Sequence, residues 1–259
     1  MTRARVVLVH GIRTSATMWR NQLRPLAEHD LDVHAVDLPA HGTRRGEPFS
    51  VHAAIDTIDE AVSGGDAAGS RGDGAPAPRL LVGLSLGGYL SIEYAARHPG
   101  RIDGLVAASC GTRPRGVALA GYQRLAAAIG RLPDQGRAVN DGMARLFLGR
   151  EAADDVVAGG VALDVMAPAL AAVGTLDPEA ALARVDCPVW LVNGRYDHFR
   201  FEERRMLRAA RDARLVVIPG ATHLVSLVRP REFTAVVLGA VAELEHRRAK
   251  ATRRSAAAT

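Results

Sequence analysis

The stretch Leu80-Leu81-Val82-Gly83-Leu84-Ser85-Leu86-Gly87-Gly88-Tyr89 decides the fold predicted for this chain. Leu80 to Val82 reads as a buried strand, and Tyr89 to Arg97 has helical character. Between them lies Gly-x-Ser-x-Gly, which places Ser85 at the apex of a sharp strand-to-helix turn. Such a turn strains the backbone of its apical residue and requires small neighbours. The pattern therefore predicts an exposed, nucleophilic serine above a helix N-terminus, although the pentapeptide alone also fits an ordinary glycine-rich turn.

Length and composition favour one α/β domain in the cytoplasm. The chain has 259 residues, 48% of them hydrophobic, which is enough for a full core. No apolar run approaches the roughly 18–20 residues that a membrane span needs, and Val6 to Val9 is too short for the core of a signal peptide. Without a secretory signal, the two cysteines, Cys110 and Cys187, are expected to be reduced thiols.

The positive charge is concentrated at one end of the sequence. The segment from His246 to Thr259 contains five basic residues and no acid, which matches the whole formal net charge of +5. A protein that binds nucleic acid needs a basic face on its folded domain, so we expect no nucleic-acid partner. We expect residues 247–259 to form a basic, flexible tail.

Strand and helix patterns alternate along most of the chain. Strands are predicted at residues 5–9, 31–36, 80–82, 102–109, 188–192 and 215–218, and helices at 18–29, 51–62, 89–97, 201–210 and 230–246. This order predicts an α/β fold with a mostly parallel sheet of about six strands, flanked by helices on both faces. The segment Ser63 to Pro78 is rich in Gly, Ala, Asp and Pro and predicts a flexible surface loop.

An alanine-rich helical block interrupts the alternation after the fourth strand. We therefore divide the chain into a first part of the core at 1–112, a helical cap at 113–184, a second part of the core at 185–246, and the tail at 247–259. The cap is expected to lie over the carboxyl edge of the sheet, where parallel α/β sheets bind their ligands.

Three polar residues follow strands and are expected to meet at this edge. Ser85 follows the strand at 80–82, Asp197 ends the segment after the strand at 188–192, and His223 ends the segment after the last strand. A neutral imidazole activates a serine by taking its proton, and a carboxylate fixes the imidazole tautomer. Asp177 and Asp186 are alternatives for the acid, but neither directly follows a strand.

The same chemistry requires donors for the oxyanion of a tetrahedral intermediate. The backbone N–H of Leu86, directly after Ser85, is one candidate. The other is the N–H of Ile12, which follows His10-Gly11 at the end of the first strand. His10 and His41 are expected to shape the loops at this edge rather than act as bases.

The ordered combination of these motifs resembles the α/β-hydrolase family. The motifs that carry the resemblance are His10-Gly11, Asp37-Leu38-Pro39-Ala40-His41-Gly42, Gly83-Leu84-Ser85-Leu86-Gly87-Gly88, Gly194-Arg195-Tyr196-Asp197 and Gly220-Ala221-Thr222-His223. The resemblance implies Ser85 as nucleophile, Asp197 as acid, His223 as base and residues 113–184 as the cap. The short segment before His10-Gly11 is similar to the start of the plant methyl esterases and hydroxynitrile lyases of this fold, whereas the long loop at 63–78 is unusual.

Further residues are candidates for the substrate pocket. They are Arg13, Trp19, Cys110, Arg113 and Phe147. Two cysteines without clustered histidines give no metal site, and the absence of a phosphate-binding loop argues against a nucleotide, so no cofactor is expected.

The leading functional hypothesis is a cofactor-free serine hydrolase for a small, largely apolar carboxylic ester, thioester or lactone. A serine at the elbow argues against the epoxide hydrolases and haloalkane dehalogenases of this fold, which use a carboxylate nucleophile. Carbon–carbon bond hydrolysis or another reaction on the same residues is an alternative, although the resembling lyases use a lysine and the only lysine here is Lys250. A receptor-like protein that binds a small molecule with little turnover is a third hypothesis. The sequence leaves the oligomeric state open.

Overall fold

The computed structural model describes residues 2–64, 77–134, 138, 142 and 150–258, and it contains a six-stranded sheet. The strands are β1 (Ala4–Val9), β2 (Leu31–Val36), β3 (Arg79–Leu84), β4 (Gly104–Ala108), β5 (Val189–Gly194) and β6 (Ala213–Ile218). They run in the order β2-β1-β3-β4-β5-β6, and every neighbouring pair is parallel. The predicted α/β architecture is confirmed. Of the predicted loop at 63–78, residues 65–76 lie outside the described residues.

The strand order places one reversal in the centre of the sheet. The chain passes from β1 to β2 on one side and then returns to build β3 to β6 on the other side. The loops after β1 and β3 therefore leave adjacent strands in different directions, which is where open α/β sheets hold their ligands. The turn at Ser85 and the His10-Gly11 loop meet at this point.

Both faces of the sheet are buried because each strand alternates between two hydrophobic clusters. Val7, Leu81 and Leu191 belong to the cluster on one face. Leu80 and Val82 belong to the cluster on the other face. Nearly continuous apolar strands of this kind are typical of parallel sheets covered by helices on both sides.

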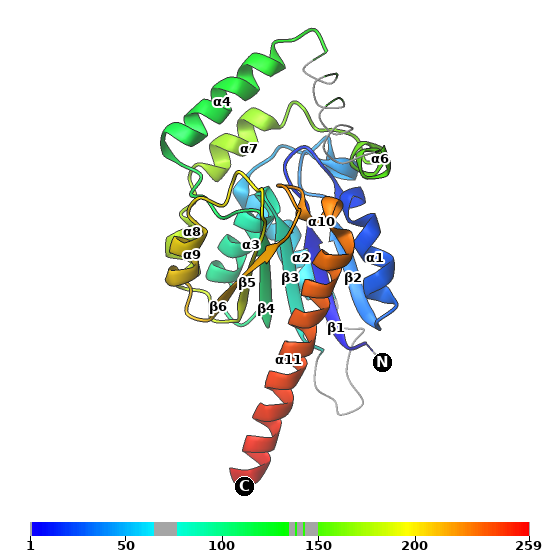
Figure 1. Ribbon diagram of the computed structural model, residues 1–259, viewed down its shortest axis with the longest axis vertical. Helices are drawn as coiled ribbons and strands as arrows, with labels where there is room; N and C mark the ends of the chain where they lie inside the picture. Colours follow the sequence, from blue (N-terminus) through cyan, green and yellow to red (C-terminus); the bar gives the residue numbers. More distant parts are fainter. Residues whose placement is uncertain (1, 65–76, 135–137, 139–141, 143–149, 259) are drawn as a thin grey trace.

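Helices form the outer layers (Figure 1). On one side lie α2 (Val51–Ser63), α3 (Leu86–Arg97) and α9 (Glu203–Ala209); on the other lie α1 (Arg20–Ala27), α10 (Val225–Val228) and α11 (Pro230–Ala258). Two short 3₁₀ helices, η1 (Ala16–Trp19) and η2 (Gly42–Arg44), follow β1 and β2. Within the described ranges, no helix combines the length and apolar character that crossing a membrane requires.

The segment between β4 and β5 contains α4 (Gly116–Gly130), α6 (Arg150–Ala158), α7 (Met166–Val173) and α8 (Pro178–Leu182). Figure 1 shows α4, α6 and α7 above the carboxyl edge of the sheet, as expected for a cap, and α8 beside α9 on the flank. An ion pair of 2.6 Å between Glu179 and Arg205 holds α8 there. Helix α8 therefore lies at the flank of the sheet, whereas α4, α6 and α7 lie above its carboxyl edge.

Polar contacts fasten one side of the cap to the loops after β1 and β2. The Thr17 hydroxyl donates to the Asp155 carbonyl oxygen at 2.7 Å, which ties α6 to η1. Arg45 pairs with Asp164 at 2.6 Å. This side of the cap thus rests on the same loops that border the predicted site.

The basic C-terminal segment differs from the expected flexible tail. Helix α11 continues through it to Ala258 and projects beyond the sheet (Figure 1). Arg247 pairs with Asp212 at 2.6 Å, and Arg248 pairs with Asp103 at 2.7 Å, so these two residues are bound to the body of the protein. Alanine and arginine have high helix propensity, which lets the helix extend without an apolar face.

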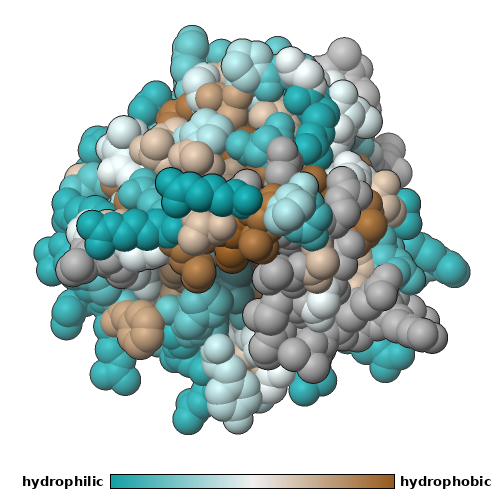
Figure 2. Space-filling model, turned by 90° about the horizontal axis from the view of Figure 1, so that it is seen from above, coloured by the Kyte–Doolittle hydropathy of each residue, from teal (hydrophilic) through white to brown (hydrophobic). Residues whose placement is uncertain are grey.

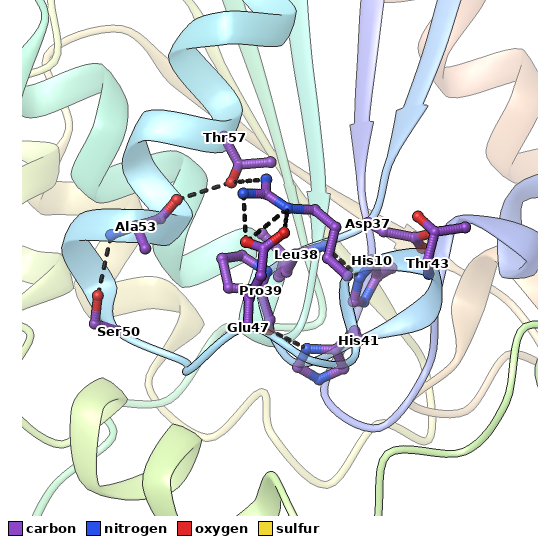
Figure 3. A network of polar contacts seen from close by, with 11 residues as sticks. His10, Asp37, Leu38, Pro39, His41, Thr43, Glu47, Ser50, Ala53 and Thr57 are labelled. Carbon is purple, nitrogen blue, oxygen red and sulfur yellow. Dashed lines mark hydrogen bonds and ion pairs between the residues drawn. The ribbon is translucent and has the colours of Figure 1, made fainter.

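Two buried histidines hold the loop after β1 (Figure 3). The backbone N–H of Leu38 donates to Nε2 of His10 at 3.0 Å, and Nδ1 of His10 lies 2.7 Å from the carbonyl oxygen of Gly11. His41 repeats the arrangement: its Nε2 accepts the Arg13 N–H at 3.3 Å, and its Nδ1 lies 2.9 Å from a carbonyl oxygen. Both rings must therefore be neutral, with the proton on Nδ1.

The pKa of both histidines is lowered, mainly by burial. Burial, with a smaller contribution from His41, lowers the pKa of His10 to about 3. Desolvation favours the neutral form of a histidine, which is the form that these hydrogen bonds require. The loop after β1 is thus fastened by neutral side chains at physiological pH.

The close approach of α3 to β1 generates a first prediction. A Cβ atom at Gly87 would lie 2.3 Å from the carbonyl oxygen of Val9, so Gly87→Ala must displace backbone. We expect it to lower the free energy of unfolding by about 1–3 kcal/mol, measured by urea denaturation. The matched control is Gly239→Ala in α11, where a Cβ meets nothing within 4 Å and the change should add about 0.5–1 kcal/mol. Equal effects of the two substitutions would contradict the close approach.

A second prediction concerns the pH dependence of stability. Because the pKa of His10 is about 3 in the folded protein and 6.5 as a model value, its contribution is complete above pH 6.5 and is lost as the pH falls towards 3. In His10→Gln, which does not titrate, we expect the free energy of unfolding to fall less steeply over this range, by up to about 1.4 kcal/mol per pH unit. Urea denaturation of both proteins at a series of pH values checks this, and parallel curves would show that His10 does not titrate on unfolding.

Candidate active site

Ser85 occupies the strained turn between β3 and α3. Its backbone angles are φ 55° and ψ −113°, in a region that side chains other than glycine rarely adopt. A Cβ at Gly83 would lie 2.3 Å from the carbonyl oxygen of Gly87, so the strand and the helix approach closely only because both positions lack a side chain. The Ser85 N–H donates to the Ala108 carbonyl oxygen at 2.8 Å, which fixes the turn to β4.

The structure brings Ser85, His223 and Asp197 together in a hydrogen-bonded row. The distance from Ser85 Oγ to His223 Nε2 is 3.0 Å, and from His223 Nδ1 to Asp197 Oδ1 it is also 3.0 Å. Asp197 follows β5 and is buried, whereas His223 follows β6 and keeps 19% of its side chain exposed. A carboxylate on Nδ1 leaves Nε2 free to accept the serine proton.

Asp197 remains a carboxylate in spite of its burial. Burial acts to raise its pKa, but the hydrogen bond and charge of His223 and the backbone N–H of Phe199 together hold the pKa below its ordinary value. The Phe199 N–H donates to Asp197 Oδ1 at 2.8 Å. An ionised acid of this kind orients the imidazole and stabilises the imidazolium.

The two backbone donors predicted for an oxyanion belong to the residues that follow Ser85 and Gly11 in the chain. Leu86 begins α3, so its N–H belongs to the first turn, whose N–H groups have no carbonyl partner within the helix. Ile12 follows Gly11, and a Cβ built on Gly11 would lie 3.6 Å from the Cβ of Ser85. The loop after β1 therefore passes directly beside Ser85.

Aromatic side chains around His223 were not expected from the sequence. The Phe199 ring centre lies 4.9 Å from that of His223, and that of His198 lies 5.1 Å from it. Tyr122 of α4 contacts Phe199 edge-on at 5.9 Å and so connects the cap to this group. Burial, followed by the charge of His223, lowers the pKa of His198. The position of Phe199, two residues after the predicted acid, was the signal available in the sequence.

The residues predicted to line the pocket have different surroundings. Cys110 is buried beside Gly88, where an added Cβ would lie 2.8 Å from its Sγ. Arg113 is bound to Glu202 by an ion pair of 2.5 Å, so its charge is already matched. Arg13 is half-buried, and its Nε has no hydrogen-bond partner among the described residues. Phe147 lies outside the described residues.

Trp19 requires a correction. It is fully buried and packs against Phe233 of α11 with ring centres 5.8 Å apart, on the core face of η1 rather than in a substrate pocket. The alternative acids are also separate from His223: Asp177 caps α8 by accepting the Ala180 N–H, and Asp186 is exposed. In the part of the chain that the structure describes, no group of three or more His, Cys, Asp or Glu residues is arranged to hold a metal ion.

Comparison with known proteins shows which sequences share this arrangement. The model of the alpha/beta hydrolase family matches residues 6–236. A pimeloyl-[acyl-carrier protein] methyl ester esterase of Cronobacter sakazakii is 30% identical over 93% of this chain and 94% of its own length. An esterase with the same name from Neisseria meningitidis serogroup C is 27% identical, over 90% of this chain and 91% of its own.

Solved structures agree in fold. A thermophilic esterase from Thermogutta terrifontis superimposes with a TM-score of 0.73, at 21% identity, over 94% of this chain and 91% of its own. MenH from S. aureus gives a TM-score of 0.75 at 18% identity, over 95% and 96%. With the family match covering most of the chain, this protein is a hydrolase and belongs to the alpha/beta hydrolase family.

Proposed function

We propose that the protein is a cofactor-free serine hydrolase that cleaves a small, largely apolar carboxylic ester, thioester or lactone through an acyl-enzyme on Ser85. The observation that carries the proposal is the row from Ser85 Oγ through His223 to Asp197, with both hydrogen bonds at 3.0 Å. The methyl ester esterases that resemble the chain over more than nine-tenths of its length support an ester as the bond that is cleaved.

In the proposed reaction, His223 acts once in the formation of the acyl-enzyme and once in its hydrolysis. His223 Nε2 takes the proton of Ser85 Oγ as this oxygen attacks the carbonyl carbon, and the N–H groups of Leu86 and Ile12 bind the oxyanion. Collapse breaks the bond to the leaving group, which departs with the proton from His223. A water molecule, deprotonated by the same imidazole, then attacks the acyl carbon; the bond to Ser85 Oγ breaks, His223 returns the proton to this oxygen, and the acid is released.

The surroundings of the row support an apolar substrate. Hydrophobic side chains gather near the middle of the cap side in Figure 2. The Phe199 ring lies against His223, and the guanidinium of Arg113 is matched by Glu202. An apolar acyl or alcohol group therefore fits this site better than a charged one. A cytoplasmic location and a small-molecule substrate remain predictions.

The other reactions of this fold find less support. The only lysine, Lys250, belongs to the last part of α11, whose end projects away from the carboxyl edge of the sheet (Figure 1), so the lysine of the resembling lyases has no counterpart near Ser85. Carbon–carbon bond hydrolysis would use the same three residues, so only a test with different substrates can distinguish it from ester hydrolysis.

Covalent labelling tests the proposal first. We expect a fluorophosphonate to add once to the wild-type protein and not at all to Ser85→Ala, as measured by mass spectrometry of the intact protein. Ser91→Ala is the matched control, because Ser91 is a buried serine of α3 whose hydroxyl has no partner among the described residues, and it should label like the wild type. A folded wild type that does not react would favour the binding-protein hypothesis. Turnover of a vinylogous 1,5-diketone but of no simple ester would favour carbon–carbon cleavage.

The acid generates a separate prediction. Asp197→Asn preserves the shape of the side chain but allows the amide to donate to Nδ1, which favours the wrong tautomer of His223. A comparable substitution in a serine protease lowers kcat by about 10⁴-fold, and we expect a loss of this order for p-nitrophenyl acetate. Steady-state kinetics check it, with Asp186→Asn as a control on an exposed acid. A loss of less than tenfold in Asp197→Asn would rule out Asp197 as the orienting acid.

A further inference from the structure

Ser109 lies at the carboxyl end of β4 in an unusual backbone conformation. It is fully buried, and its φ angle of 54° is close to the 55° of Ser85. Residues other than glycine rarely adopt such angles, and they keep them where the surrounding contacts hold the backbone in place. The contacts that hold Ser109 in this strained conformation therefore indicate its role in the structure.

These contacts reach the three segments that carry the catalytic row. The Ser109 hydroxyl donates to the carbonyl oxygen of His223 at 2.6 Å. Its N–H donates to the carbonyl oxygen of Val192, in the strand that leads to Asp197, at 2.8 Å. The preceding residue, Ala108, accepts the N–H of Ser85 at 2.8 Å.

The hydroxyl of Ser109 donates to His223 and not to the neighbouring Asp197. The second carboxylate oxygen of Asp197, Oδ2, is buried without a hydrogen-bond partner among the described residues. A hydroxyl has a single hydrogen to donate, and in this structure it is directed to His223.

We propose that Ser109 is a positioning residue, whose hydroxyl holds the backbone of His223 where its imidazole reaches both Ser85 and Asp197. The segment from Pro219 to Leu224 joins β6 to α10 without regular structure, and the Tyr196 N–H ties it to the loop after β5 by donating to the Ala221 carbonyl oxygen at 2.9 Å. The carbonyl of His223 is bound otherwise only by the N–H of Val225, at 3.0 Å, within the described contacts. The Ser109 hydroxyl thus adds a side-chain bond from the end of β4 at the residue that carries the imidazole.

The inference rests on the proposed function, since it concerns the same imidazole. It makes a prediction that general destabilisation would not. Without the hydroxyl, His223 samples positions from which it cannot take the serine proton, whereas the substrate still binds. A loss confined to kcat follows, with KM unchanged.

The experiment compares Ser109→Ala with Ser226→Ala. Ser226 is also fully buried, but its hydroxyl has no partner in the described structure, so its removal controls for the loss of a buried hydroxyl near His223. With p-nitrophenyl acetate we expect kcat of Ser109→Ala to fall about tenfold at unchanged KM, the size of one net hydrogen bond. Ser226→Ala should match the wild type. The rate of fluorophosphonate labelling should fall by the same factor as kcat.

A double substitution separates positioning from distortion of the elbow. In a His223→Ala background, Ser109→Ala should have no further effect on the residual rate, because it acts through the imidazole. A further tenfold loss in this background would mean that Ser109 acts on Ser85 through Ala108, and an unchanged kcat in the single variant would mean that the bond is only structural. Either result overturns the inference.

A folding failure of Ser109→Ala and an inactive wild-type protein have different consequences. If Ser109→Ala does not fold, Ser109→Gly removes the same hydroxyl while relieving the φ angle of 54°, and the same fall in kcat is expected. If the wild-type protein itself neither labels nor turns over ester, the proposed function fails, rather than the role of Ser109 within it.

Discussion

The close contact between the backbones of β1, β3 and α3 is the constraint on which the site depends. Ser85 stands clear of the sheet because Gly83 and Gly87 have no side chains to separate the strand from the helix. The same contact places the loop after β1 beside Ser85, since a Cβ on Gly11 would lie 3.6 Å from the Cβ of Ser85. The positions of the proposed nucleophile and of the loop after β1 are therefore set by one packing arrangement.

Neutral hydrogen bonds hold the loop after β1, whereas the row of Ser85, His223 and Asp197 ends in a charged carboxylate. His10 and His41 are buried as neutral rings that each join two backbone segments, which avoids placing a charge in the core. Asp197 keeps its charge because the imidazole of His223 and the Phe199 N–H compensate its burial. This division leaves the negative charge next to the one imidazole that becomes positive during the proposed reaction.

Sequence patterns predicted what depends on local order along the chain. Apolar runs predicted the strands. The polar residues in the loops that follow three of them predicted Ser85, Asp197 and His223 as neighbours, because parallel strands all end at one edge. The position of Trp19 and the pairing of Arg113 could not be read in this way, since both depend on partners far away in sequence. The helical form of residues 247–258 escaped prediction because it follows from helix propensity without an apolar stripe.

Backbone strain is concentrated at the edge of the sheet that carries the chemistry. Among the described residues, five positions other than glycine have a positive φ, and four of these follow β1, β2, β3 and β4: Arg13, Ala40, Ser85 and Ser109. Each such residue costs on the order of 1–3 kcal/mol, which a sheet buried on both faces can offset. A strained residue after a single strand could reflect the geometry of one turn. Its recurrence after four neighbouring strands shows that the chain turns sharply at the carboxyl edge of the sheet, where the polar side chains lie. The stability of the core is therefore what allows this edge to hold Ser85 and its partners in one geometry.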